Sequence, residues 1–86
     1  RYFWKKLKEL EKIHQDILEI RGAGLLLGIK TKSNNLKVSQ ALKKNLLLNV
    51  TASENVVRLA PPLIITKENV DDATNIIDKT FKELND

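Results

Sequence analysis

Residues 56–65 read Val56-Val57-Arg58-Leu59-Ala60-Pro61-Pro62-Leu63-Ile64-Ile65. The β-branched run predicts a short strand, and the two prolines remove two backbone donors, so the strand cannot continue unchanged. Strand side chains alternate between faces, which places Arg58 with Val56 and Ala60 and opposite Val57 and Leu59. A guanidinium on an apolar strand is costly to bury unless an anion meets it. Arg58 is therefore either a solvated surface residue or a bidentate clamp for a carboxylate or phosphate, and its residue type leaves both open.

Three blocks of sequence, taken in order, resemble the C-terminal segment of class III pyridoxal-phosphate-dependent aminotransferases. The first is Ile20-Arg21-Gly22-Ala23-Gly24-Leu25-Leu26-Leu27-Gly28-Ile29, which is similar to the family's "RGxGLxxGI" segment. The second is Leu46-Leu47-Leu48-Asn49-Val50, and the third is the arginine strand with its prolines. The likeness is closest to the acetylornithine aminotransferase family, and ornithine and 4-aminobutyrate aminotransferases share the same blocks.

The resemblance implies the small C-terminal domain of a fold-type I pyridoxal-phosphate enzyme. Residues 1–16 would form a helix that leads in from a large domain, and residues 17–86 would form the small domain. The implied enzyme is a cytoplasmic homodimer of arginine biosynthesis. It would carry the amino group of N-acetylornithine to 2-oxoglutarate, giving glutamate. In this family the arginine of the proline motif binds a substrate carboxylate, which assigns Arg58 as the substrate-binding residue.

The same resemblance implies that the catalytic machinery lies outside this chain. The lysine that holds pyridoxal 5'-phosphate belongs to the large domain of the family, and none of the twelve lysines here has a matching context. We therefore expect no catalytic, cofactor-binding or metal-binding residue in these 86 residues, and no activity from them alone. The chain opens at Arg1 within a predicted helix and contains no methionine, so we expect a piece of a longer protein.

Composition excludes several classes of protein. The chain has no cysteine for a disulfide framework or a thiolate metal site. No apolar run approaches the ~18 residues of a membrane span, and we expect no membrane partner. The net charge of +4 comes mainly from lysines spread along predicted helices, which is typical of a solvated surface. His14 is the only histidine and has no second metal-type ligand at helical spacing, so we expect no chemistry from it.

An alternative from another class stays open, namely a free-standing basic α+β binding module. The four lysines of the first helix would then meet an acidic partner or nucleic acid, with steep salt dependence. The positions of the aromatic residues argue against a nucleic-acid partner. They fall on predicted helices, whereas an RNA-binding sheet carries its aromatic residues on the strands. We therefore expect no nucleic-acid partner.

Three stretches have the periodicity of amphipathic helices, namely residues 2–15, 36–44 and 67–84. The polar loop 33–35 can cap the second helix and Thr66 the third, while Asn45 suits the left-handed conformation that ends the second. The expected buried stripes are Phe3, Leu7, Leu10 and Ile13; Val38, Ala41 and Leu42; and Val70, Ala73, Ile77, Phe81 and Leu84.

The remaining segments predict strands. Residues 17–32 have the pattern of a strand interrupted at Gly22-Ala23-Gly24, where the glycines permit a bulge, a bend or a tight turn. The family resemblance implies one bent strand, with Arg21 pairing near the bend. A phosphate-binding loop there is excluded, because strand-like residues follow the glycines instead of a helix N-terminus. Residues 46–50 predict a buried strand that turns through 51–55 and pairs antiparallel with the arginine strand. The expected fold is α+β, an antiparallel sheet of about three strands with helices packed on one face.

Overall fold

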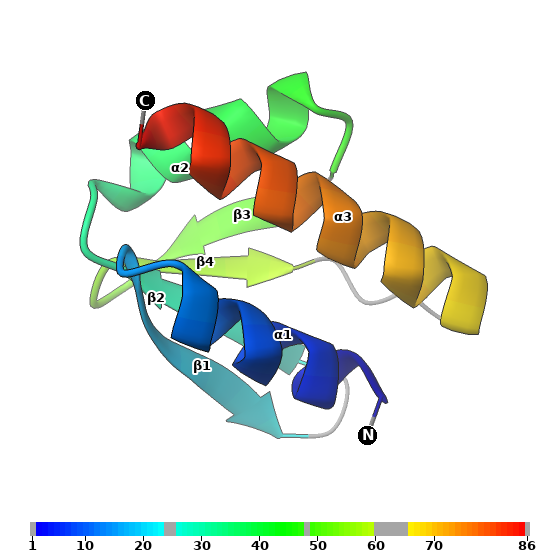
Figure 1. The fold of residues 1–86 in the computed structure, drawn as a ribbon. Coiled ribbons are helices and arrows are strands. Elements are labelled where there is room, and N and C mark those ends of the chain that lie inside the picture. The colour runs from blue at the N-terminus through cyan, green and yellow to red at the C-terminus, as the bar shows by residue number, and fades with distance from the viewer. Residues whose placement is uncertain (1, 24–25, 48, 60–65, 86) are drawn as a thin grey trace.

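The computed structural model describes residues 2–23, 26–47, 49–59 and 66–85. Its elements, in chain order, are α1 (Tyr2–Ile13), β1 (Ile17–Ala23), β2 (Leu26–Thr31), α2 (Asn35–Lys44), β3 (Asn49–Ala52), β4 (Val56–Leu59) and α3 (Lys67–Leu84). The strands form one antiparallel sheet in the order β1-β2-β4-β3, and the helices gather on one side of it (Figure 1). The α+β layer expected from the sequence is confirmed.

The strand count differs from the expectation of about three. Residues 17–32 form two antiparallel strands, in which Ile20 pairs with Ile29 and Ala23 pairs with Leu26. Gly22 has φ 143°, a conformation that residues with side chains rarely adopt. Apolar residues lie on both sides of the glycines, so a bent strand and a hairpin are equally compatible with the sequence. The hairpin is favoured because the chain reverses its direction between Ile20 and Ile29, which lets these two side chains be buried side by side.

The predicted strand at residues 46–50 is wrong in its bounds, because helix α2 ends in a Schellman motif that occupies its first residues. The Leu47 amide donates to the Leu42 carbonyl at 2.9 Å, and the Leu46 amide donates to the Lys43 carbonyl at 2.9 Å. Leu46, rather than the expected Asn45, takes the left-handed conformation with φ 72°, and it is 88% exposed. Strand β3 therefore begins only at Asn49, and it pairs antiparallel with β4 as predicted.

Both expected helix N-caps are confirmed. The Asn34 side chain, in the polar 33–35 loop, accepts a hydrogen bond from the Leu36 amide at 2.9 Å. The Thr66 hydroxyl accepts one from the Asn69 amide at 3.0 Å. Each cap satisfies a backbone donor that the first turn of a helix leaves without a partner.

The core lies between the three helices and the inner face of the sheet. Strand β4 alternates as predicted, with Val57 and Leu59 0% and 2% exposed and Arg58 exposed on the other face. Ala60 and the Pro61-Pro62 pair lie outside the described residues. The largest fully buried hydrophobic side chains come from the sheet and from every helix: Leu7, Ile29, Val38, Leu42, Val57, Leu59, Ile77 and Phe81.

At the end of helix α1, the buried residue is not the one that the predicted apolar stripe contains. Ile13 is 64% exposed, and His14 is buried in its place, because positions 7, 10 and 14 follow the helical period as well as 7, 10 and 13 do. The His14 ring lies 5.8 Å from the ring of Phe81, and its Nε2 atom is 2.6 Å from Oδ1 of Asp78. Asp78 also pairs with Lys82 at 3.2 Å. This contact joins the end of α1 to the middle of α3.

One asparagine fixes the start of β4. Asn55 adopts φ 62°. Its side-chain nitrogen Nδ2 donates to the Thr31 carbonyl at 2.6 Å and to the Ser33 carbonyl at 2.8 Å. Its side-chain oxygen accepts from the Asn35 amide at 2.8 Å. The turn between β3 and β4 is thereby attached to the connection between β2 and α2, which fixes where Arg58 lies along the sheet.

The contact between His14 and Asp78 predicts a pH-dependent stability. The hydrogen bond with His14 holds the pKa of Asp78 below its ordinary value. Because the folded pKa is lower than the unfolded value of about 3.9, the carboxylate stabilises the fold above pH ~4, and this contribution is lost as the pH falls further. Asp78→Asn should lower the free energy of unfolding by about 1–2 kcal/mol at pH 6, and the difference should shrink towards pH 3. Thermal unfolding of the protein containing this chain, between pH 3 and 6, measures it.

The matched control is Asp72→Asn, an exposed carboxylate on the same helix, which should change stability by less than about 0.5 kcal/mol. An Asp78→Asn effect that stays constant across that pH range would contradict the assignment.

Leu46 offers a stabilising substitution. Leu46→Gly removes a backbone strain of about 1–2 kcal/mol from the left-handed conformation. The greater freedom of glycine in the unfolded chain reduces this gain in stability by about 0.4–1 kcal/mol. We expect a net gain of about 0.5–1 kcal/mol in thermal or urea unfolding. Leu36→Gly is the control, because Leu36 is also exposed but lies in the first turn of α2, where glycine should cost about 1 kcal/mol. Destabilisation by both variants would contradict the role given to φ at residue 46.

Candidate functional site

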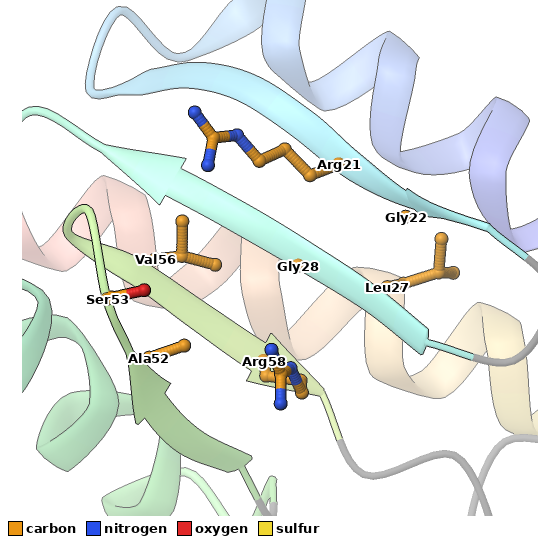
Figure 2. A pocket seen from close by; sticks show the side chains of 8 residues that line it. All are labelled: Arg21, Gly22, Leu27, Gly28, Ala52, Ser53, Val56 and Arg58. Atoms are coloured by element: carbon orange, nitrogen blue, oxygen red, sulfur yellow. The ribbon is translucent and has the colours of Figure 1, made fainter.

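A hollow of about 290 Å³ lies on the outer face of the sheet, opposite the helices (Figure 2). It is bordered by β1, β2, β4 and the end of β3 with the turn that follows it. The lining residues are Arg21, Gly22, Leu27, Gly28, Ala52, Ser53, Val56 and Arg58. Both arginines that the sequence singled out are therefore brought to one place.

Strand register explains why the two arginines share this hollow. Arg21 pairs with Gly28 on β2, and Gly28 pairs with Arg58 on β4, so the three residues form one row across the sheet. Residues directly opposite each other in antiparallel strands share a face. A Cβ atom at Gly28 would lie 2.8 Å from Cγ1 of Val56, so the position is closed to a side chain unless Val56 moves. The row consequently has a gap between its two cations.

Arg21 is held by two carboxylates. Its Nε atom donates to Oε1 of Glu19 at 3.1 Å, and its Nη1 atom donates to Oε1 of Glu54 at 2.5 Å. The hydrogen bond from Arg21 lowers the pKa of Glu54, and the same bond raises the pKa of Arg21. The partner that the sequence left unnamed is thus found both on β1 and in the turn between β3 and β4.

Arg58 has a different environment from Arg21. Its side chain is exposed on the outer face, and it makes no hydrogen bond or ion pair with any residue that the structure describes. Figure 2 shows Arg21 lying along the sheet from β1, while Arg58 projects from β4 beside Gly28. A guanidinium presents several donors in a planar fork, which matches the two oxygens of a carboxylate. Among the described residues, Arg21 is therefore paired with two carboxylates and Arg58 with none.

The lysines do not fit the site of a pyridoxal-phosphate cofactor. All twelve lie within the described residues and none is buried, whereas a lysine that forms a Schiff base is activated by desolvation or a neighbouring cation. Among the same residues, no group of three or more histidine, cysteine, aspartate or glutamate side chains could hold a metal ion.

The lysines of α1 do not form an unbroken cationic surface. Lys6 pairs with Glu9 at 3.8 Å, and Lys8 pairs with Glu11 at 2.7 Å. Two of the four cations that a basic binding module would use are thus compensated within the helix. None of the described helices has the length and apolar character needed to cross a membrane.

Comparison with known proteins places this chain in a family. The sequence model described as aminotransferase class-III matches residues 1–81. The acetylornithine aminotransferase of Caldanaerobacter subterraneus subsp. tengcongensis is 41% identical over 98% of this chain and 22% of its own length. The ornithine aminotransferase of Geobacillus sp. (strain WCH70) is 40% identical over 93% of this chain and 20% of its own length.

Solved structures give the same result. The acetylornithine aminotransferase of Elizabethkingia anophelis superimposes with a TM-score of 0.83 at 36% identity, covering 94% of this chain and 22% of that one. A Plasmodium falciparum ornithine delta-aminotransferase gives a TM-score of 0.86 at 40% identity, covering 98% of this chain and 22% of that one. The chain thus spans about a fifth of the length of the relatives it matches. Because the family model and these likenesses extend along almost its whole length, the chain belongs to the class III aminotransferases.

Proposed function

We propose that this chain is the C-terminal small domain of a pyridoxal-phosphate-dependent aminotransferase, and that Arg58 binds a carboxylate of the substrate. Residues 1–16 would lead in from a large domain, and residues 17–86 would form the small domain itself. The observation that supports this most is the exposed guanidinium of Arg58, which pairs with none of the described residues and lies on the sheet face that no described helix covers. Pyridoxal 5'-phosphate would be held by residues of the large domain, as the resemblance to the family implies.

The role of Arg58 would be to bind and to orient. Two parallel hydrogen bonds from its fork would fix both the position and the rotation of a carboxylate. Holding that group in one orientation also fixes the neighbouring Cα–H bond, whose proton is removed in transamination, and lowers the entropy lost on reaching the transition state. The other arginine of the hollow, Arg21, is already paired with Glu19 and Glu54, which leaves the Arg58 guanidinium as the group that would pair with a substrate carboxylate.

The amino-group acceptor would be 2-oxoglutarate, which becomes glutamate, and the donor would be N-acetylornithine. Ornithine is the nearest alternative donor, because relatives named for either substrate match at about 40% identity. 4-Aminobutyrate is a further alternative. Homodimeric assembly, a cytoplasmic location and the lack of nucleic-acid or membrane partners stay predictions.

The assignment of Arg58 is tested in the intact enzyme. Arg58→Lys keeps the charge but loses the planar fork, and we expect KM for 2-oxoglutarate to rise tenfold or more. Arg58→Gln, which removes the charge as well, should raise it further. The control is Lys44→Gln, which removes an exposed cation from α2 and should leave KM within about twofold. If steady-state kinetics gave an unchanged KM for both Arg58 variants, the carboxylate-binding role would be abandoned.

The donor is tested by comparing kcat/KM of the intact enzyme for N-acetylornithine, ornithine and 4-aminobutyrate. We expect N-acetylornithine to be preferred by at least about tenfold, well within the discrimination of about 10⁴-fold that a site built to hydrogen-bond a polar group can reach. A preference for ornithine would move the protein to the alternative assignment without affecting the role of Arg58.

A further inference from the structure

We propose that Glu54 is a specificity-determining residue of the hollow. Together with Glu19 it pairs with Arg21 and keeps this second guanidinium from binding an anion, so that the ligand presents only one carboxylate to this sheet. The inference rests on the proposed function, because it takes Arg58 as the group that binds that carboxylate. It goes further in naming the residue that limits the charge of the bound group.

The row of residues across the sheet places both guanidinium groups beside one volume. Arg21 and Arg58 lie on strands separated only by β2, so their backbones are about 10 Å apart, two strand spacings. The residue between them is Gly28, which has no side chain to separate them. Both arginines line the same hollow, with Arg58 beside Gly28 and the Arg21 side chain extended along the sheet (Figure 2).

Glu54 is held over the sheet by its own backbone. Glu54 and Asn55 both have left-handed φ values, 63° and 62°, and the Glu54 carbonyl accepts a hydrogen bond from Nζ of Lys30 at 2.7 Å. This geometry brings a residue of the turn between β3 and β4 to an arginine of β1, 33 positions earlier in the chain. The carboxylate thus reaches Arg21 from the opposite side of the hollow, across β2.

Stability alone does not account for this pair. The side chains of Arg21 and Glu54 are 37% and 64% exposed, and exposed ion pairs contribute little to folding. The charge they cancel lies on the lining of the hollow, where an unpaired cation about 8–10 Å from a ligand carboxylate would change its binding about two- to threefold. The principal consequence of the pair is therefore the charge that the hollow presents.

The experiment compares two four-carbon inhibitors of the intact enzyme, succinate with two carboxylates and butyrate with one. Competitive inhibition constants against 2-oxoglutarate are measured for the wild type and for Glu54→Gln. We expect the ratio of the succinate constant to the butyrate constant to fall about two- to threefold in Glu54→Gln, and further when Glu19→Gln is added. The control is Glu68→Gln, the same change at an exposed site in the first turn of α3, which should leave the ratio unchanged.

A third variant assigns the change to Arg21. Adding Arg21→Gln to Glu54→Gln should restore the wild-type ratio, because the positive charge that Glu54 had compensated is then absent. The inference is overturned if succinate and butyrate tighten equally, if Glu68→Gln has the same effect, or if the altered ratio survives the loss of Arg21.

Arg58→Gln separates this inference from the proposed function. Weaker binding of both inhibitors in Arg58→Gln, together with an unchanged ratio in Glu54→Gln, would refute the role of Glu54 and leave the role of Arg58 supported. Unchanged binding of both inhibitors in Arg58→Gln would remove the carboxylate site, and this inference with it.

Discussion

The central position of β4 in the sheet is the constraint on which the rest of the structure depends. The strand pairs with β2 on one side and β3 on the other, and its inner face buries Val57 and Leu59 against the helices. A slip of one residue would expose these two side chains and bury Arg58. The hydrophobic free energy of the core therefore holds the arginine on the outer face.

The turn that precedes β4 links the fold to the properties of the hollow. Asn55 uses its side chain to satisfy backbone groups of the connection between β2 and α2, and its neighbour Glu54 extends over the sheet to Arg21. The first contact fixes the position of the strand, and the second sets the charge around it. The segment that orients Arg58 thus also governs its electrostatic environment.

Much of the fold could be predicted, and the failures have a common cause. The three helices, the N-caps and the outward position of Arg58 follow from patterns that span a few residues. Residues 17–32 contain a hairpin where a bent strand was expected, and β3 begins at Asn49 instead of residue 46. Both differences depend on where the chain reverses its direction. The Schellman motif at Leu46 was missed because leucine is not a residue expected at φ 72°.

By itself, the sequence determined the periodicity of the helices, their capping residues, the face of β4 that carries Arg58 and the likeness to an aminotransferase family. Only the tertiary structure decided which side chains meet: Arg21 with Glu54, His14 with Asp78, and the two arginines across Gly28. The physical reason is distance along the chain. Alternation and capping act between near neighbours, whereas these pairings depend on strand order and register, which follow from burying all the apolar faces at once.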